Sequence, residues 1–346
     1  MTDLKDFRST APLSPNRRAL LVGGLAGFAL QGCTKREAST RPVLKIGDQR
    51  GGVHALMTAA GALEGAPYDV DWIDMPAAAP LLESLSAGAV DLGSVGGAPF
   101  AFAYANGAKV KAVLAARIVN ADPAAGRSAA ILVPGRSPLR TVADLRGRKL
   151  STVKGSAGHE TALRIFEHAG IDPKSVQFVF LNNGDSKAAL GSGAVDAWST
   201  WGTYVGIAVE ENGDRVLADA SPLVRAGRVS GFQVASDKAL REKRAVIHDF
   251  LERYIRAREW ARAHIDDYAA QIAKETGVPL AVARYSTAQI TAAEFAPFDA
   301  DLLADQRATL QRYVNAGVID KIPPLDQSGY DSSFNDLTTP AKGAAS

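Results

Sequence analysis

The sequence predicts an α/β protein with two lobes, each built on a mainly parallel sheet, and two crossover strands that join the lobes. Short β-rich runs alternate with helical runs along the chain, which is typical of a parallel sheet covered by helices. The alternation stops at an apolar run at 129–135 and then starts again. In addition, GAVDLGSVGG at 88–97 returns as GAVDAWSTWG at 193–202. Each lobe is therefore expected to contain one copy of the same strand and turn.

The first block of alternating elements occupies residues 43–132. A helix in this block is expected to end at Gly88, because glycine adopts the left-handed conformation that ends many helices. Pro99 supports a helix start near Ala98, since proline is preferred at the first helical position. The β-rich runs lie at 43–48, 70–75, 90–95 and 110–116, and the helical runs lie at 51–63, 76–88 and 97–107.

The second block occupies residues 133–233. It begins with TVADLRG, in which Thr141 is placed to cap a short helix and Gly147 to end it. The apolar strand at 229–236 returns the chain to the first lobe, and with the strand near 130 it is expected to form the hinge. Further strands are expected at 149–153, 176–181 and 195–201, and helices at 156–170, 186–193 and 203–213.

The remainder of the chain changes character. Residues 237–316 are expected to be almost entirely helical, because apolar residues recur at helical spacing in HDFLERYIRAREWA and DLLADQRATLQRYV. These helices are expected to pack back on the first lobe, which then comprises 43–132 and 234–322. Residues 323–346 are rich in Pro, Ser, Asp and Thr, so we expect an irregular C-terminal tail.

Residues 1–33 have the pattern of an export signal. Arg17 and Arg18 precede an uncharged stretch of fourteen residues, from Ala19 to Gly32, which is too short to cross a hydrocarbon core of about 30 Å as a helix. A basic start, an apolar centre and a small-residue end are typical of secretion, either by the Tat route that twin arginines allow or by the Sec route. We therefore expect the working protein outside the cytoplasmic membrane.

The signal ends in ALQGC, which resembles a bacterial lipobox, where the cysteine is lipidated and becomes the first residue of the mature protein. Cys33 is the only cysteine in the chain, so no intramolecular disulfide can form. Lipid on Cys33 would anchor the protein to a membrane, with residues 34–42 as a polar tether. The alternative is a signal that is cleaved elsewhere, with no role for Cys33.

The composition argues against several classes of function. With 47% hydrophobic and 22% charged residues, the chain is composed like a soluble globular protein. The first 33 residues account for the formal net charge of +2, and the other basic residues are scattered among acidic ones, so no nucleic-acid surface is expected. The sequence has no metal-ligand spacing, no G-x-S-x-G elbow and no Walker loop. We therefore expect neither catalysis nor a metal or other cofactor.

Four strands are each followed by a glycine-bearing turn and a helix, at 47–52, 94–100, 153–160 and 199–204. In an open parallel sheet, ligands lie beyond the carboxyl ends of the strands. Glycine lets the backbone approach a ligand closely, and the N–H groups at the start of a helix favour an anion. Because two of these turns fall in each lobe, the sequence predicts a cleft that holds a sulfonate, sulfate or carboxylate group.

Several side chains in and near these turns are candidates for ligand contact. Trp201 and Tyr204 can wall an organic substituent, unless one of them belongs to the core. His159 can donate to an anion from the first turn of its helix, or it is an ordinary surface histidine. Gln49 offers amide donors. The candidate ligand-binding residues are Gln49, Arg50, Gly51, Gly97, Ala98, Arg117, Ser156, Gly158, His159, Trp201 and Tyr204.

As a set, IGDQRGG, ILVPGRSPLRTVADLRGRKL, KGSAGHETAL and SGAVDAWSTWGTY resemble the aliphatic sulfonate, nitrate and taurine family of ABC-transporter substrate-binding proteins. The resemblance covers 43–315 and is most specific in SP-x-x-TVADL-x-G-x-K followed by a KGS turn. It implies a type II periplasmic-binding-protein fold that closes on a small organic anion and delivers it to a membrane permease powered by an ATPase. It also implies ligand contacts at Gln49 and its neighbours, Gly97–Ala98, Ser156–His159 and Trp201–Tyr204. We expect a monomer in the periplasm.

The chain departs from the family pattern at two turns. The family often has Gly-Asp-Ala-Pro at the place of Gly96–Pro99, and Trp-Asp-Pro-Tyr at the place of Trp201–Tyr204. Both departures remove a carboxylate that the ammonium of an aminosulfonate would need. We therefore expect an alkyl or aryl sulfonate or a sulfate ester as the ligand.

Other readings of the same sequence stay open. The ligand can instead be nitrate, taurine or a thiamine precursor, and the protein can be a ligand sensor rather than part of an importer. An enzyme on the same fold is a further alternative. Relatives that remove sulfinate groups are expected to use a cysteine of the mature chain, however, and Cys33 lies in the export signal.

Overall fold

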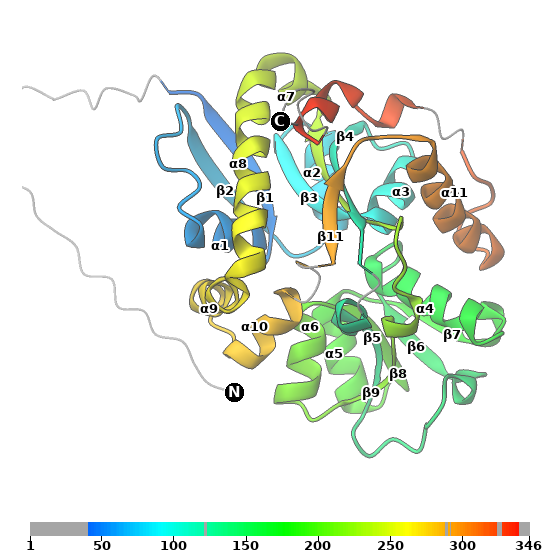
Figure 1. Ribbon diagram of the computed structural model, residues 1–346. Coiled ribbons are helices and arrows are strands. Elements are labelled where there is room, and N and C mark those ends of the chain that lie inside the picture. The colour runs from blue at the N-terminus through cyan, green and yellow to red at the C-terminus, as the bar shows by residue number, and fades with distance from the viewer. Residues whose placement is uncertain (1–40, 121–122, 288–289, 291, 324–326, 339–346) are drawn as a thin grey trace, which may run out of the picture. The chain divides into compact units, whose positions relative to one another are not determined.

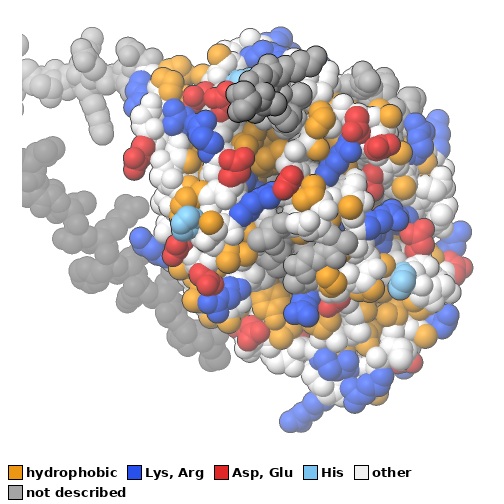
Figure 2. Space-filling model, viewed as in Figure 1, with side chains coloured by type: hydrophobic (Ala, Val, Ile, Leu, Met, Phe, Trp, Pro, Cys, Tyr) orange, Lys and Arg blue, Asp and Glu red, His pale blue; other side chains and the backbone are white. Residues whose placement is uncertain are grey.

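The computed structural model describes residues 41–120, 123–287, 290, 292–323 and 327–338 (Figure 1). The predicted export signal, Cys33 and the tether up to residue 40 lie outside the described residues, so these expectations stay predictions. Within the described part of the chain, no helix is both long enough and apolar enough to cross a membrane. On the face shown in Figure 2, lysines and arginines are interspersed with acidic side chains.

The first sheet has six strands in the order β11-β4-β10-β3-β1-β2. β1 is parallel to β2 and β3, whereas β10 is antiparallel to β3 and β4. We call this sheet and the helices packed on it the first lobe. Its strands are β1 (Val43–Gln49), β2 (Asp69–Met75), β3 (Leu92–Gly96), β4 (Val110–Ile118), β10 (Val229–Ser236) and β11 (Ala293–Ala296).

The second sheet has five strands in the order β7-β6-β8-β5-β9. β6 is parallel to β7 and β8, whereas β5 is antiparallel to β8 and β9. This sheet and its helices form the second lobe. Its strands are β5 (Ala129–Val133), β6 (Lys149–Thr152), β7 (Gln177–Phe180), β8 (Ala197–Trp201) and β9 (Arg215–Asp219).

The prediction of a two-lobed α/β fold is confirmed, with a difference in strand direction. Each sheet is mixed rather than mainly parallel, because the strand that follows each crossover, β5 or β10, is antiparallel to both of its neighbours. β9 and β11 are additional strands that the sequence pattern does not predict. β11 lies within 237–316, which apolar spacing predicts to be almost entirely helical. Its four residues pair only with the edge of β4, and so short a strand shows no alternating pattern.

Helices cover the first sheet because their apolar residues fall on one side. In α8, Ile247, Phe250, Leu251 and Tyr254 recur at helical spacing and are buried in one cluster with Leu44 of β1. The first-lobe helices are α1 (Gly52–Ala59), α2 (Ala78–Ser86), α3 (Gly97–Ala105), α7 (Asp237–Glu242), α8 (Arg244–Ala263) and α9 (Ile265–Thr276).

The second lobe carries α4 (Ala157–His168), α5 (Asn183–Ser192) and α6 (Thr203–Gly206), and α6 continues into a π-helical turn at Ile207–Glu211. α4 begins at Ser156, whose hydroxyl accepts the N–H of His159 at 3.2 Å, a typical N-cap. Short 3₁₀ helices lie at Pro123–Ser128, Val142–Leu145, Pro173–Ser175, Ser221–Leu223, Gln327–Gly329 and Ser332–Leu337.

Two of the late helices contact the second lobe. α10 (Leu280–Thr287) packs on α6, where Gly206 lies so close to Val282 and Tyr285 that a side chain would not fit. α11 (Ala300–Asn315) contacts both α3 and α4. The expectation that the late helices pack back on the first lobe therefore describes α8 and α9, which contact α1. It is incomplete for α10, which contacts α9 as well as α6, and for α11.

The described part of the C-terminal segment is not an irregular tail. Tyr330 pairs with Ala112 of β4, and the N–H of Asp331 donates to the Ala112 carbonyl at 2.8 Å. Tyr330 and Phe334 are buried in the hydrophobic clusters of the first lobe. This segment therefore completes the core beside β4.

The repeated GAVD segments form the same turn in both lobes. Gly88 follows α2 with φ +69°, and Gly193 follows α5 with φ +76°, a region that favours glycine. Three residues later, Asp91 and Asp196 each accept the backbone N–H of a lysine on the adjacent strand at 2.8 Å, from Lys45 and Lys149 respectively. Each turn thereby starts a strand that leads to the site described next.

Candidate functional site

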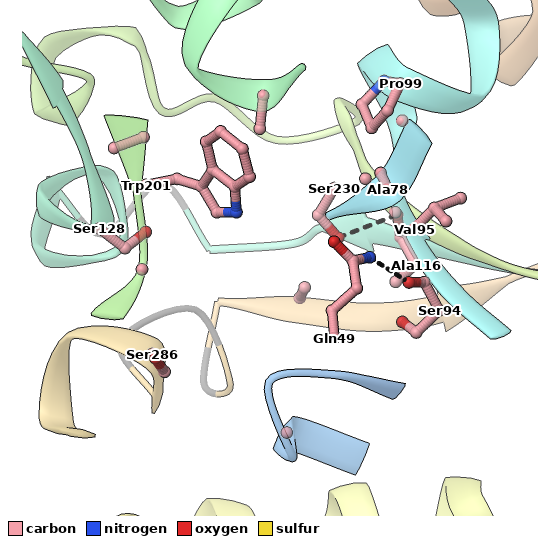
Figure 3. Close-up of a pocket in the computed structure, with 18 of the residues that line it drawn as sticks. Gln49, Ala78, Ser94, Val95, Pro99, Ala116, Ser128, Trp201, Ser230 and Ser286 are labelled. Atoms are coloured by element: carbon pink, nitrogen blue, oxygen red, sulfur yellow. Dashed lines mark hydrogen bonds between the residues drawn. The ribbon is translucent and has the colours of Figure 1, made fainter. Parts of the chain in front are cut away.

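A pocket of about 380 Å³ is lined by residues of both lobes. Figure 3 shows Trp201 and Ser128 on one side, and Gln49, Ser94 and Ser230 on the other. The Gln49 amide nitrogen donates to the Ser94 carbonyl at 2.7 Å, and this bond fixes its side chain at the end of β1. Of the predicted ligand-binding residues, the structure places Gln49, Arg50, Gly97, Ala98, Ser156, Trp201 and Tyr204 around this pocket.

Two helices begin at the pocket, one from each lobe. Gly97 and Ala98 start α3, and Ser156 and Ala157 start α4. The N–H groups in the first turn of a helix have no acceptor within the helix, and the helix dipole makes this end positive. The pocket therefore receives backbone donors from two directions, which suits an anion with several oxygens.

The first of the four predicted turns differs, because α1 is capped from within. The Asp48 carboxylate accepts the N–H of Val53 at 3.0 Å and the N–H of His54 at 2.8 Å. Asp48 is buried, and this burial raises the pKa of its carboxyl. Two of the helix N–H groups that the turn at 47–52 is expected to offer to the ligand are therefore already engaged, although Gln49 and Arg50 from the same turn line the pocket.

Gly97 and Gly202, the last residues of the two repeats, both line the pocket, and each needs to be glycine for its own reason. A Cβ on Gly97 would lie 3.1 Å from Val229 and 3.2 Å from Gln306. Gly202 has φ +57° and ψ −135°, a combination that is essentially restricted to glycine. Gly97 lets the start of α3 pack closely on Val229 and Gln306, and Gly202 lets the backbone turn sharply between β8 and α6.

Arg50 reaches across the pocket to the second lobe. Its Nη1 donates to the Tyr204 hydroxyl at 3.1 Å, and its guanidinium carbon lies 4.7 Å from the centre of the Tyr204 ring. Among the described residues, Arg50 is the only non-glycine residue with a positive φ, which is +54°. Such backbone strain is concentrated at functional sites. Its buried Nε has no hydrogen-bond partner among the described residues. Arg50 therefore offers an unused donor beside the pocket.

A buried ionic cluster at the pocket was not found from the sequence. Glu160 of α4 is 2% exposed and is surrounded by three arginines. Arg228 approaches it at 2.9 Å, Arg312 at 3.5 Å and Arg164 at 3.6 Å. Burial lowers the pKa of Arg164 to about 10, so this arginine remains charged at neutral pH.

This cluster has more positive than negative charge. Arg312 also pairs with Glu167 at 2.7 Å, so three guanidinium groups face two carboxylates. Arg228 lines the pocket together with Glu160. The spacing of Glu160 and Arg164 in the HETALR stretch indicates a helical ion pair. Arg228 and Arg312, however, contact Glu160 from distant parts of the chain, so no local sequence pattern predicts these ion pairs.

His159 is not placed to donate to a ligand in this pocket. Its side chain is fully buried, with Nδ1 accepting the N–H of Gly155 at 3.1 Å. The rings of Phe178, Phe180 and Tyr313 surround it at 5.0–5.2 Å. Burial, with a smaller contribution from Lys154, lowers the pKa of His159 to about 3. The residue is thus a neutral core histidine, which is neither of the roles the sequence suggested.

Three other predicted residues lie outside the pocket lining. Arg117 pairs with Asp299, and its guanidinium faces the Pro297 carbonyl. Gly51 has φ +72° in the turn before α1. At Gly158, a Cβ would lie 2.6 Å from the Ser199 carbonyl oxygen, so this glycine allows α4 to pack closely on β8. These positions have structural reasons for their residue types.

Two further observations limit the chemistry of the site. No group of three or more His, Cys, Asp and Glu side chains within the described ranges is placed to hold a metal ion. The acidic residues of the described lining are Asp48 and Glu160. Both of their carboxylates are already engaged, one by two backbone N–H groups and the other by arginines.

Comparison with known proteins gives matches over most of the chain. Residues 68–267 match the family model described as NMT1/THI5 like. A putative aliphatic sulfonates-binding protein of Escherichia coli (strain K12) is 30% identical over 308 residues, which are 88% of this chain and 94% of that protein.

Solved structures agree with this match. The alkanesulfonate-binding protein SsuA from Xanthomonas axonopodis pv. citri bound to MOPS is 27% identical with a TM-score of 0.71, over 82% of this chain and 96% of that one. The periplasmic aliphatic sulphonate binding protein SsuA from Escherichia coli is 30% identical with a TM-score of 0.67, over 82% of this chain and 90% of that one. The predicted periplasmic-binding-protein fold is thereby confirmed.

Proposed function

Because this chain belongs to the NMT1/THI5-like family, we propose that it captures an organic sulfonate or sulfate ester between its lobes and delivers it to the permease of an ABC importer. Closure of the lobes encloses the ligand, and the N-terminal signal directs the protein to the periplasm. The relatives that match over most of their length are named for binding aliphatic sulfonates or alkanesulfonates, which supports this ligand class.

The observation that carries the proposal is the convergence of two helix N-termini and two arginines on one pocket. α3 and α4 supply first-turn N–H groups, and Arg50 and Arg228 supply guanidinium donors. A sulfonate has three oxygens that accept hydrogen bonds and one negative charge, so it can use donors from several directions. The surplus positive charge around Glu160 favours the bound anion further.

The pocket also favours a ligand without an ammonium group. An ammonium would need a carboxylate or several free acceptors, and the carboxylates of Asp48 and Glu160 are already engaged. The indole of Trp201 and the ring of Tyr204 lie 6.3 Å apart in an edge-to-face arrangement on the second-lobe wall. These rings provide an apolar surface for the carbon next to the sulfonate.

Ethanesulfonate and taurine make the sharpest test, because they differ only in the amino group. We expect isothermal titration calorimetry of the purified protein to give tighter binding for ethanesulfonate. Sulfate and nitrate, which lack the organic part, should bind more weakly than ethanesulfonate. Tighter binding of taurine would contradict the ligand class, and no binding of any sulfonate or sulfate ester would contradict the proposed function.

We propose binding rather than catalysis, and export with a lipid anchor on Cys33. Incubation with ethanesulfonate should release no sulfite, and sulfite release would identify an enzyme. Expression of the full chain in a bacterial host should place it in the membrane fraction, whereas the Cys33→Ser variant should not carry lipid. A wild-type protein without lipid would contradict the anchor and leave the binding proposal intact.

A further inference from the structure

A second cavity lies beside the ligand pocket, between α2, α3 and the turn that precedes α4. Its volume is about 640 Å³. We call it the side groove. The apolar part of its lining consists of several alanines and the larger side chains of Leu82, Pro99, Phe102 and Val153.

The side groove and the ligand pocket share part of their walls. Ala78, Pro99 and Ser156 line both cavities. Ser156 is the N-cap of α4, where we place the anion, whereas Ala78 and Pro99 are apolar and lie on the side of the pocket opposite Trp201 in Figure 3. Ala78 and Pro99 therefore lie between the place of the anion at α4 and the side groove, so the tail of a bound anion would have to pass them to reach the groove.

The two lobes meet at the floor of the side groove. Gly155 has φ +73°, and a Cβ there would lie 2.3 Å from the ring of Phe102 on α3. Phe102 is packed in turn against Tyr313 of α11, with ring centres 5.3 Å apart. The groove is thus a space between the lobes, like the ligand pocket, and its shape depends on the same closure.

The polar groups of the side groove do not suit a second charged head group. Its charged residues, Glu83, Lys109 and Lys154, are all exposed to solvent and include both signs. Most of the remaining lining consists of alanine and larger apolar side chains. Such a surface gains free energy by removing hydrocarbon from water.

We propose that the side groove holds the apolar tail of the sulfonate whose anionic head lies at the N-termini of α3 and α4. This inference rests on the proposed function and narrows it to sulfonates with a long alkyl or an aryl tail. We choose the ligand's own tail as the occupant because the groove adjoins the ligand pocket. A tail attached to the bound anion would fill the groove without a second binding event.

The test measures how affinity depends on tail length. The n-alkanesulfonates from ethanesulfonate to decanesulfonate, below their micelle concentrations, are titrated into the purified protein by calorimetry. Beyond butanesulfonate, we expect each added methylene to lower the Kd by roughly two- to fourfold. If the Kd stays constant beyond butanesulfonate while ethanesulfonate binds, the side groove does not hold the tail, and the proposed function is unaffected. No binding of any sulfonate would overturn both.

Two variants at Ala79 locate the effect in the groove. Ala79 is exposed on α2 and lines the side groove but not the ligand pocket. Ala79→Trp fills the groove, and Ala79→Asp places a charge in it. Both variants should therefore abolish the gain in affinity with tail length, and both should keep the Kd of ethanesulfonate within about twofold of the wild-type value.

Ala188 is an exposed alanine of α5 that lines neither cavity. Ala188→Trp and Ala188→Asp are therefore matched controls, and both should keep the full gain. If both Ala79 variants also keep it, the tail lies elsewhere and the proposal is wrong.

Discussion

The guanidinium of Arg50 lies over the ring of Tyr204 at 4.7 Å and donates to its hydroxyl at 3.1 Å. Arg50 follows β1 in the first lobe, and Tyr204 belongs to α6 in the second. A single residue pair therefore joins the lobes by two kinds of interaction at the wall of the ligand pocket. The pair is made only when the lobes are close, so it adds to the stability of the closed state.

Variants of Tyr204 should separate the two interactions. Tyr204→Phe removes the hydroxyl but keeps the ring under the guanidinium, so we expect the Kd of ethanesulfonate to rise by roughly two- to fivefold. Tyr204→Ala also removes the cation–π contact and should raise it by about tenfold or more. Calorimetry measures both values, and Tyr104→Phe on α3, outside the pocket, is the control. Equal losses in the two Tyr204 variants would show that the ring contributes nothing.

Arg228 should be the charged group that the ligand needs most. A hydrogen bond to a charged group contributes about 1.5–3 kcal/mol, so Arg228→Gln should raise the Kd of ethanesulfonate by roughly 10- to 100-fold. Arg256→Gln removes the same charge from an exposed position of α8 and should leave the Kd unchanged. If the two variants lower the affinity equally, the effect is one of net charge and not of the pocket.

Two glycines offer a matched test of close approach. A Cβ at Gly97 meets Val229 and Gln306 within 3.3 Å, whereas a Cβ at Gly191 of α5 meets nothing within 4 Å. Neither glycine has a positive φ. We therefore expect Gly97→Leu to abolish ethanesulfonate binding and Gly191→Leu to leave it unchanged. Thermal unfolding checks that both variants fold. Normal ethanesulfonate binding by Gly97→Leu would show that Gly97 is not part of the binding site.

The buried His159 should make the fold sensitive to acid. Its pKa is about 3 in the folded protein and about 6.5 in an unfolded chain. Between these values the unfolded state binds the extra proton, so stability falls as the pH falls from 6.5 towards 3. From pH 7 to pH 5, this site should account for about 2 kcal/mol of lost unfolding free energy.

Urea unfolding of the wild type and of His159→Gln measures this difference. Glutamine keeps an acceptor for the Gly155 N–H but does not titrate, so the variant should lose less stability on acidification. His168→Gln, at the solvent-exposed end of the same helix, should behave like the wild type. An identical pH dependence in wild type and His159→Gln would show that the buried histidine is not protonated on unfolding.

The sequence located the parts of the site that have a local signal. Gly97, Trp201 and Gln49 lie in or beside glycine turns at strand ends, where both the fold class and the turn are visible in the residues themselves. Ser128, Arg228 and Ser230 lie at the crossovers, and they line the pocket only because the chain passes between the lobes there. A crossover segment has no periodicity of its own, so its side chains cannot be assigned to a cleft before the fold is known.

The role of His159 shows a different limit. Every residue of α4 from Gly158 to Phe166 is buried, because the helix lies between β8 and α11. An amphipathic helix has an exposed side on which a histidine is available to solvent or ligand. A helix that is covered on opposite sides has no such side, and its sequence, with Glu160 and Arg164 paired inside, still looks polar. The burial of His159 follows from α11, which is distant in the chain.

The two GAVD turns have a consequence for the order of folding. Ala89 and Ala194 donate backbone hydrogen bonds at 2.9 Å to Ser84 and Ala189, which lie only five residues earlier in the chain. The surroundings differ, since Asp91 is buried beside Lys243 and Asp196 is more exposed beside Arg148. The same backbone bonds form in both places, so the turn is encoded locally. Contacts between residues close in sequence need no long loop to close. Both turns can therefore form before either sheet and set the starting points of β3 and β8.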